Sequence, residues 1–421
     1  MLLAQSQTGF YNSISMTARY ELAANLVRDY DIESLIFSAL RKVINRHAPT
    51  GVSIRENSDP YFLRLPRIDL RQVTQFTRQC NITSILGSAH RMSMETQAEL
   101  PLWRVIIMTN KDFVHTIDVA FLFDHTICDG LSGFTFHHEL LHALNGVQGP
   151  TSPIVDVPQL HIFPPIEETY PFPRLLPLPP ANPDDFCWSG APVNIQNKTN
   201  HLRIFYLSPF ILDVVLQICR DNNVALTSLF NVLIARLLYK MYPAYTLFRG
   251  LCTVSSRRFT GTDNREMVNY VEPLFQQFSP TAGTNYIQCG GKFNWNAVRV
   301  CDSEIKAVTC GTGSNHQFPS LSVQEFSNEL MKFIGQRRLC AFSISNVGIF
   351  DQNILDKVQI SRIVFSQSIH INGPALQFTL AAAKGGELAV ALTWQEGIVE
   401  VNVAERVLYD LEVEFCRLAV M

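Results

Sequence analysis

The sequence has few charged residues and no surplus of either sign. Charged residues make up 17% of the 421 residues, and 34 Lys and Arg stand against 37 Asp and Glu, a net charge of −3. Without a basic surplus, the chain has no electrostatic footprint for nucleic acid or an anionic membrane. Hydrophobic residues reach 47%, and 421 residues are too many for one compact core. These figures predict a globular chain with two lobes.

Long apolar runs and metal-binding cysteine spacings are also absent. No apolar run reaches the 18 or more residues needed to span a bilayer. The first residues lack the basic flank and apolar core of a signal peptide. The ten cysteines include no CxxC pair. We therefore expect a cytoplasmic protein with reduced, buried cysteines and no transmembrane segment.

A proline-rich segment divides the sequence. Between Gly146 and Asn200 lie 12 of the 22 prolines, a density that helices and central strands do not tolerate. The prediction is an N-terminal lobe over 1–145, a crossover segment over 146–200 and a C-terminal lobe over 201–421. Apolar periodicity predicts helices at about 31–47, 132–145, 209–221, 226–241 and 402–419. Strands are predicted at about 61–65, 103–109, 114–123, 202–207, 247–254, 341–349, 361–366, 375–383 and 387–395.

The run Phe121-Leu-Phe-Asp-His-Thr-Ile-Cys-Asp-Gly130 carries the strongest chemical signal. An apolar strand delivers His125 to its end, Asp129 follows four positions later, and Gly130 is expected to turn the chain into a helix. A neutral imidazole placed there can accept a proton from an alcohol or amine that attacks an acyl carbon. Taken alone, His125 has a structural alternative, and Asp129 has one as a helix N-cap. Together they predict a general base in a turn that the aspartate locks by pairing with an arginine, and Val254-Ser-Ser-Arg-Arg258 supplies a candidate.

A second histidine motif follows on the next predicted helix. His138-Glu-Leu-Leu-His142 matches HExxH, which places two histidines on one helix face as a zinc site requires. A metzincin would continue with Gly at 145 and His at 148, but the chain has Asn145 and Gln148. The nearest candidates for a further Glu ligand lie in the proline-rich segment. We therefore expect no metal site.

Six pieces of the chain, in order, carry a family resemblance: Thr8-Gly-Phe-Tyr with Ala18-Arg-Tyr20, the helix Ala39–His47, Pro101-Leu-Trp-Arg-Val-Ile106, the turn Phe123–Gly133, Ala225–Phe230 and Ser343-Ile-Ser-Asn-Val-Gly348. Together they resemble acyltransferases of the chloramphenicol-acetyltransferase-like fold, and the fungal alcohol O-acetyltransferases above all. That superfamily also contains plant-type acyl-CoA-dependent enzymes and peptide-synthetase condensation domains. Two features depart from the pattern: Asp124 stands where many relatives carry a second histidine, and the DFGWG signature of plant members is absent.

The resemblance implies an α/β (α+β) fold of two lobes of mixed sheet with flanking helices and a tunnel between them. It implies an acyltransferase that moves an acyl group, acetyl first of all, from CoA to a hydroxyl of an apolar small molecule such as a secondary metabolite. No cofactor is expected to be bound permanently, because acyl-CoA is a co-substrate, and a monomer is expected.

The resemblance also implies roles for individual residues. His125 and Asp129 form the catalytic pair, with His125 as the base for direct attack on the thioester, so no acyl-enzyme forms and Cys128 is structural. Gly130 and Arg257 support the site, and Arg257 is the expected partner of Asp129. Weaker candidates for contact with substrate or the tetrahedral intermediate are Asp124, Ser343 and Asn346, of which Asn346 could equally be a strand-end or turn residue.

Two other functions stay open. A condensation-type enzyme would use an acyl group on a carrier protein, or an amine acceptor, and would be indifferent to free CoA. A non-catalytic binding protein of the same fold is more distant, because His125, Asp129 and Gly130 are all present.

Overall fold

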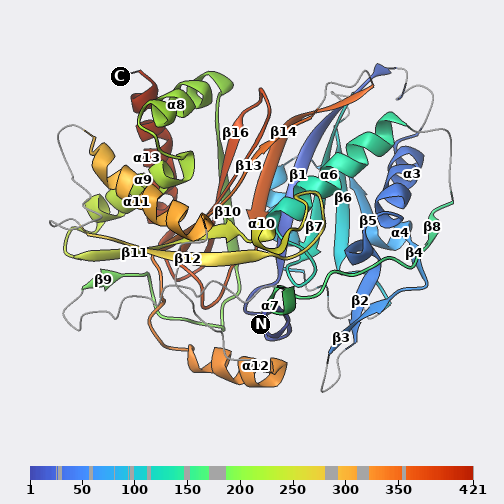
Figure 1. Cartoon of the computed structure of the whole chain (residues 1–421), viewed down its shortest axis with the longest axis horizontal. Coiled ribbons are helices and arrows are strands. Elements are labelled where there is room, and N and C mark those ends of the chain that lie inside the picture. Colours follow the sequence, from blue (N-terminus) through green and yellow to red (C-terminus); the bar gives the residue numbers. More distant parts are fainter. Residues whose placement is uncertain are drawn as a thin grey trace.

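The computed structural model describes the whole chain except residues 25, 27–30, 56–59, 80, 93, 95–98, 111–114, 147–151, 170–185, 280–292, 311–321, 353–356 and 421. Two sheets, each with its own helices, lie side by side along the long axis of the molecule (Figure 1). Each sheet has its own large apolar core, and these two cores hold most of the buried hydrophobic side chains.

The first sheet carries the strand that leads to His125. Its order is β14–β1–β7–β6–β5, with β7 antiparallel to both β1 and β6. Nearly all of β7 is buried, which explains the unbroken apolar run Val119–Phe123 within it. Helix α6 packs against β1, β14 and α3. The bounds are β14 (Val358–Gln367), β1 (Ser13–Leu22), β7 (Thr116–Asp124), β6 (Trp103–Thr109), β5 (Thr74–Thr77), α3 (Ile32–Ile44) and α6 (Gly130–Asn145).

The second sheet has the order β10–β16–β15–β13–β11–β12, with β9 paired to β11. It is mixed, because β13 runs parallel to both β11 and β15. Helix α9 packs against β11 and β13, and α8, α11 and α13 pack around α9 (Figure 1). The bounds are β10 (Asn200–Leu207), β16 (Leu388–Gln395), β15 (Leu376–Ala383), β13 (Phe342–Phe350), β11 (Leu247–Ser255), β12 (Val271–Phe278), β9 (Cys187–Trp188), α8 (Pro209–Asp221), α9 (Leu226–Met241), α11 (Trp295–Thr309) and α13 (Val401–Ala419).

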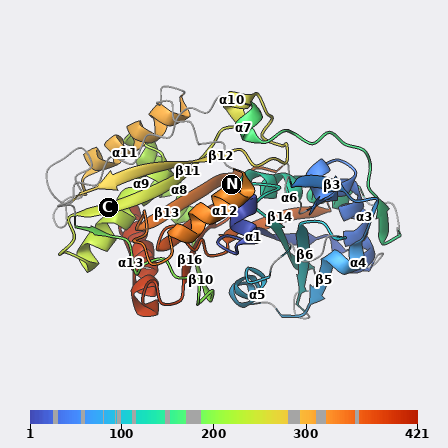
Figure 2. The same cartoon turned by 90° about the horizontal axis from the view of Figure 1, so that it is seen from below.

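The remaining described elements are short. Helix α1 packs against α12 beneath the junction of the two sheets (Figure 2). Small two-stranded sheets pair β2 with β3 and β4 with β8. The bounds are α1 (Leu2–Gln7), α4 (Leu70–Val73), α5 (Ile82–Ala89), α7 (Ile166–Thr169), α10 (Arg257–Thr260), α12 (Val323–Lys332), the 3₁₀ helix η1 (Ala48–Gly51), β2 (Val52–Arg55), β3 (Tyr61–Arg64), β4 (Arg67–Asp69) and β8 (Ile154–Asp156).

Strand β14 crosses from the second lobe to the first. It follows β13 of the second sheet in sequence but pairs with β1 at the edge of the first sheet. The division at 146 and 201 stays a prediction, and the pairing of β14 shows that the last third of the chain contributes to both sheets. The proline-rich segment also departs from expectation in one detail, because residues 166–169 form one helical turn, α7.

The described helices include none that alone is long and apolar enough to cross a bilayer. Only α8 and α9 taken together meet that length and composition, and the chain bends by 99° between them.

Candidate active site

The turn after β7 places His125 at the junction of the two lobes. Strand β7 ends at Asp124, and α6 begins at Gly130 with Asp129 as its N-cap. The Asp129 carboxylate accepts a hydrogen bond from the backbone N–H of Ser132, and the Ser132 hydroxyl lies within 3.4 Å of the backbone nitrogen of Asp129. This reciprocal capping fixes the first turn of α6 and therefore the five residues between strand and helix.

Gly130 is required for close packing. A Cβ at this position would lie 2.6 Å from Cγ1 of Val347 and 3.1 Å from the Phe365 ring. The expectation that Gly130 turns the chain is wrong, because it is the first helical residue and is not among the glycines with positive φ. The turn is made by His125–Asp129, and the glycine lets β13 and β14 approach the helix start.

The imidazole of His125 is held in one tautomer. Its Nδ1 lies 2.8 Å from the carbonyl oxygen of Cys128, and because a carbonyl can only accept, Nδ1 must carry the proton. The other ring nitrogen, Nε2, therefore keeps its lone pair. His125 is partly buried. Burial lowers its pKa below the ordinary value, and this outweighs the opposing hydrogen bond to Cys128 and the charges of Asp129 and Asp124. A neutral imidazole with a free Nε2 is the form a general base needs.

A buried ion pair joins the turn to the second lobe. Nη1 of Arg257 lies 2.5 Å from Oδ2 of Asp129, and Nη2 lies 2.8 Å from Oδ1. Both side chains are almost inaccessible, at 1% and 0% exposed. The structure thus contains the pair predicted between these two residues, in the bidentate geometry typical of Arg–carboxylate contacts.

The loop between α10 and β12 completes this contact. The backbone N–H of Tyr270 donates to Oδ2 of Asp129 at 3.1 Å. The Ser132 hydroxyl donates to the carbonyl oxygen of Val268 at 2.8 Å, and the backbone N–H of Asp129 donates to the same oxygen at 3.1 Å. The Asp129 carboxylate is therefore fully engaged by protein groups, so it acts on the site by holding the turn.

Asn269 lies in the same loop and contacts His125 directly. Its Nδ2 donates to the backbone carbonyl of His125, in a short hydrogen bond, and lies 3.1 Å from His125 Nδ1. Sequence reasoning missed this residue, because it falls in the stretch 261–340 where no periodic pattern was legible. No local signal could have found it, since the contact spans 144 residues.

An aromatic and histidine group borders the other side of the imidazole. Tyr11 meets the His125 ring edge-on at 5.3 Å between centroids, and His370 stacks on Tyr11 at 4.8 Å. The Tyr11 hydroxyl donates to Oε1 of Gln367, and Gln5 Nε2 lies 3.0 Å from His370 Nε2. Tyr11 belongs to the N-terminal piece singled out in the sequence, but His370 and Gln5 were not predicted. They come from the loop after β14 and from α1.

The three weaker site candidates are hydrogen-bonded to other protein groups or buried in a strand. Asp124 is buried, and its carboxylate accepts hydrogen bonds from the Ser6 hydroxyl at 2.5 Å and from the N–H and hydroxyl of Thr126. Asn346 donates to the Thr227 hydroxyl at 3.0 Å and accepts from the backbone N–H of Gly348. Asn346 lies within β13, where its pairing with β15 becomes irregular, and these contacts engage its side chain inside the protein. Ser343 lies buried within β13, and contact of any of the three with substrate stays a prediction.

Cys128 is a poor nucleophile where it stands. Its side chain is fully buried, and burial raises the pKa of the thiol far above the ordinary value. A protonated thiol with no solvent access is unreactive. The contribution of Cys128 to the site is its backbone carbonyl, which fixes the tautomer of His125.

Two of the three HExxH residues have ordinary packing or pairing partners, and the third, His142, is exposed. The His138 ring stacks on Phe350 at 4.0 Å, and Glu139 forms an ion pair with the exposed Arg46 at 2.9 Å. Burial and the nearby Arg265 charge lower the pKa of His138 to about 4. The described part of the chain holds no group of three or more His, Cys, Asp or Glu side chains placed to bind a metal ion.

Comparison with known proteins agrees with the predicted resemblance. Residues 81–185, which contain the His125 turn, match the family model "Alcohol acetyltransferase". A probable alcohol acetyltransferase of Aspergillus fumigatus is 25% identical over 95% of this chain and 94% of its own length. A probable alcohol acetyltransferase of Fusarium pseudograminearum is 23% identical over 85% and 81%.

Solved structures share the fold over nearly the whole chain. A trichothecene 15-O-acetyltransferase from Fusarium sporotrichioides has a TM-score of 0.70 at 11% identity and covers 99% of this chain and 93% of its own. The first condensation domain of the calcium-dependent antibiotic synthetase has a TM-score of 0.67 at 12% identity, over 100% and 94%. The two-lobed fold, the resemblance to fungal alcohol acetyltransferases and the prediction of an acyltransferase enzyme are confirmed.

Proposed function

We propose that this chain, an alcohol acetyltransferase-like member of the chloramphenicol-acetyltransferase-like acyltransferases, moves an acetyl group from CoA to a hydroxyl of an apolar small molecule. The observation that carries the proposal is the state of His125. Its Nδ1 proton is committed to the Cys128 carbonyl, so its Nε2 is the one basic atom of the ring. The family match and the curated relatives support acyl-CoA as the donor and an alcohol as the acceptor.

The chemistry assigned to His125 is proton transfer in both halves of one displacement. Nε2 takes the proton of the acceptor hydroxyl as that oxygen forms a bond to the thioester carbonyl carbon. The tetrahedral intermediate then collapses, the carbon–sulfur bond breaks, and the imidazolium returns the proton to the departing thiolate. The products are the ester and free CoA, and His125 ends in its starting form.

The residues around His125 act as positioning residues in this proposal. The Asp129–Arg257 pair and the Asn269 amide fix the turn from the second lobe, so the imidazole needs no reorientation during the reaction. The junction of the lobes, where these contacts lie, is where we place the tunnel that brings both substrates to Nε2. The chain is proposed to work as a monomer with no permanently bound cofactor.

The test is to incubate the purified chain with acetyl-CoA and a panel of alcohols and amines and to follow the release of free thiol. Acceptor-dependent release, with the acetyl ester identified by mass spectrometry, supports the proposal. The condensation-type alternative is tested in parallel with the same acyl group on a phosphopantetheinylated carrier protein. Transfer from the carrier combined with no transfer from free acetyl-CoA would contradict the proposed donor.

A further inference from the structure

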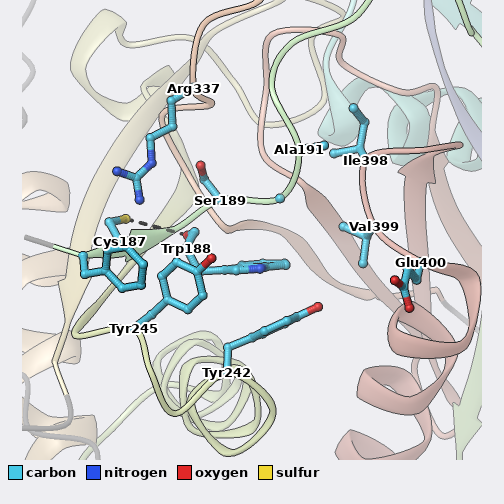
Figure 3. A pocket seen from close by; sticks show the side chains of 12 residues that line it. Cys187, Trp188, Ser189, Ala191, Tyr242, Tyr245, Arg337, Ile398, Val399 and Glu400 are labelled. Carbon is cyan, nitrogen blue, oxygen red and sulfur yellow. Dashed lines mark hydrogen bonds between the residues drawn. The ribbon is translucent and has the colours of Figure 1, made fainter.

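The second lobe contains a cavity that is separate from the candidate active site. Its volume is about 440 Å³, within the range of small-molecule sites. Its walls come from three places: residues 186–191 around β9, the turn after α9 at Tyr242 and Tyr245, and residues 398–400 just before α13, with Arg337 beside them (Figure 3). None of the residues that line it belongs to the His125 turn or its second-lobe contacts.

One wall of the cavity is aromatic and rigid. The rings of Trp188 and Tyr242 stack with centroids 4.6 Å apart, and those of Phe186 and Tyr245 stack at 4.5 Å. Tyr242 and Tyr245 also meet edge-on, with centroids 6.2 Å apart, so the two stacked pairs contact each other. Trp188 is buried, whereas the two tyrosines are partly exposed. Preformed ring surfaces of this kind favour a flat apolar ligand, because little side-chain freedom is lost on binding.

Two polar groups that line the cavity have no hydrogen-bond or ion-pair partner among the described residues. The Ser189 side chain is only 2% exposed, yet its hydroxyl has no hydrogen-bond partner in the described part of the chain. Ser189 and Arg337 line the same cavity (Figure 3). The Arg337 guanidinium is exposed and forms no ion pair within the described residues. A buried hydroxyl without a partner and an unpaired cation that line one cavity are what an anionic acceptor group such as a carboxylate would satisfy.

The opposite end of the cavity carries a negative charge. Glu400 is the N-cap of the 19-residue helix α13, but its side chain makes no capping hydrogen bond. It is exposed, and Figure 3 shows it on the other side of the aromatic wall from Arg337. A free carboxylate at this end opposes a ligand with several negative charges, such as a nucleotide. A ligand with one negative charge at the Arg337 end avoids this repulsion.

We propose that this cavity is a second ligand site that binds a flat aromatic acid with a single carboxylate. The ring lies on the wall formed by Trp188, Tyr242 and Tyr245, and the carboxylate lies between the Ser189 hydroxyl and the Arg337 guanidinium. Glu400 excludes polyanions, acyl-CoA among them. The site is independent of the proposed acyl transfer, since it involves neither His125 nor the contacts that hold it.

The test uses indole-3-acetate as the probe and isothermal titration calorimetry of the full chain. We expect saturable binding of one equivalent, and binding of the neutral indole-3-acetamide to be about tenfold weaker or more, because it lacks the charge that Arg337 pairs with. Arg337→Ala should weaken indole-3-acetate by a similar factor, and Ser189→Ala by a smaller one. Glu400→Gln should tighten it. Arg67→Ala, which removes an exposed arginine from the first lobe, is the matched control and should change nothing.

Two further measurements separate this site from the active site. Excess acetyl-CoA should not displace the probe, and His125→Ala should bind it as the wild type does, whether or not acetyl transfer is observed. The proposal is overturned by the absence of saturable binding at millimolar probe, by unchanged affinity in Arg337→Ala, or by displacement with acetyl-CoA. Displacement would assign the cavity to the co-substrate.

Discussion

Two histidine-bearing segments of the same strand–helix unit differ sharply in what surrounds them. Around His125, the carbonyl of Cys128 fixes the tautomer, and Arg257, Asn269 and Tyr270 reach the turn from the second lobe. Around His138, the contacts are a stacked phenylalanine and a surface ion pair between its neighbour Glu139 and Arg46.

Both segments match a catalytic spacing in the sequence, so spacing alone does not separate them. What separates them is the number of polar groups from distant parts of the chain that contact each segment. At the first, buried polar groups from distant parts of the chain meet on one turn and hold one ring nitrogen free. At the second, His138 stacks on a phenylalanine, Glu139 has a single exposed partner, and His142 is exposed. A motif becomes a candidate site when the fold supplies the groups that orient it.

The largest expected difference comes from removing one imidazole from each segment. His125→Ala should lower turnover about 10²–10⁴-fold, the usual contribution of a general base. His142→Ala, on the exposed face of the HExxH helix, should stay within a few-fold of wild type. Turnover measured by thiol release, with circular dichroism to check folding, decides between them. Equal losses of turnover in the two variants would contradict the assignment of His125, and not the HExxH segment, to catalysis.

Breaking an ion pair at each segment compares their contributions to stability. Arg257→Met leaves the buried Asp129 carboxylate without its partner and should reduce the free energy of unfolding by about 3–5 kcal/mol. Arg46→Met breaks an exposed pair with Glu139 and should cost less than about 1 kcal/mol. Urea unfolding of both variants measures the difference. Similar small values would mean that the buried pair does not hold the turn.

Asn269 sharpens the comparison, because it tests whether the second lobe positions the imidazole. Asn269→Ala removes one hydrogen bond to the His125 backbone and should lower kcat about tenfold. Asn269→Asp places a carboxylate near Nδ1 and should also raise the pKa of His125. The acid limb of the pH–rate profile should therefore move to higher pH in Asn269→Asp and stay in place in Asn269→Ala. A profile that is identical in all three proteins would assign Asn269 a purely structural role.

The wild-type pH profile follows from the burial of His125. Because burial lowers its pKa below 6.5, the neutral base persists as the pH falls through 7 and is lost only when the pH passes the lowered value. We expect kcat/KM to be flat around neutral pH and to decline in a single acid limb centred below pH 6.5. An acid limb centred above 7 would show that the base is another group or is less buried.

Much of the fold could be predicted from the sequence, because long apolar elements show a clear periodicity. The predicted helix at 209–221 and strand at 103–109 coincide with α8 and β6, and most others agree within a few residues. The misses include short elements such as β5 and α5, whose periodicity is too brief to read. They also include the ten-residue strand β1, which alternates apolar and polar residues but was not among the predicted strands. Strand β12, at 271–278, was lost in the stretch from 261 to 340 that showed no clear pattern.

The site was only partly legible, for a different reason. His125, Asp129 and Arg257 form recognisable local patterns, and a buried carboxylate beside a strand end calls for a cation. Asn269 and His370 do not, because their contacts depend on how a loop of one lobe meets a turn of the other. Gly130 was picked out for the wrong reason, since its need for a small side chain comes from Val347, more than two hundred residues away in the chain.

The central claim is that His125 promotes direct transfer between two bound substrates, and a covalent route through Cys128 is its sharpest rival. The most direct measurement is the intact mass of the enzyme after incubation with acetyl-CoA alone, together with initial rates at varied concentrations of both substrates and the rate of Cys128→Ala. The account predicts no added acetyl group, intersecting initial-rate lines and most of the activity retained in Cys128→Ala, because the thiol is buried and protonated. Stoichiometric acetylation at Cys128 that added alcohol removes, with parallel initial-rate lines, would contradict it.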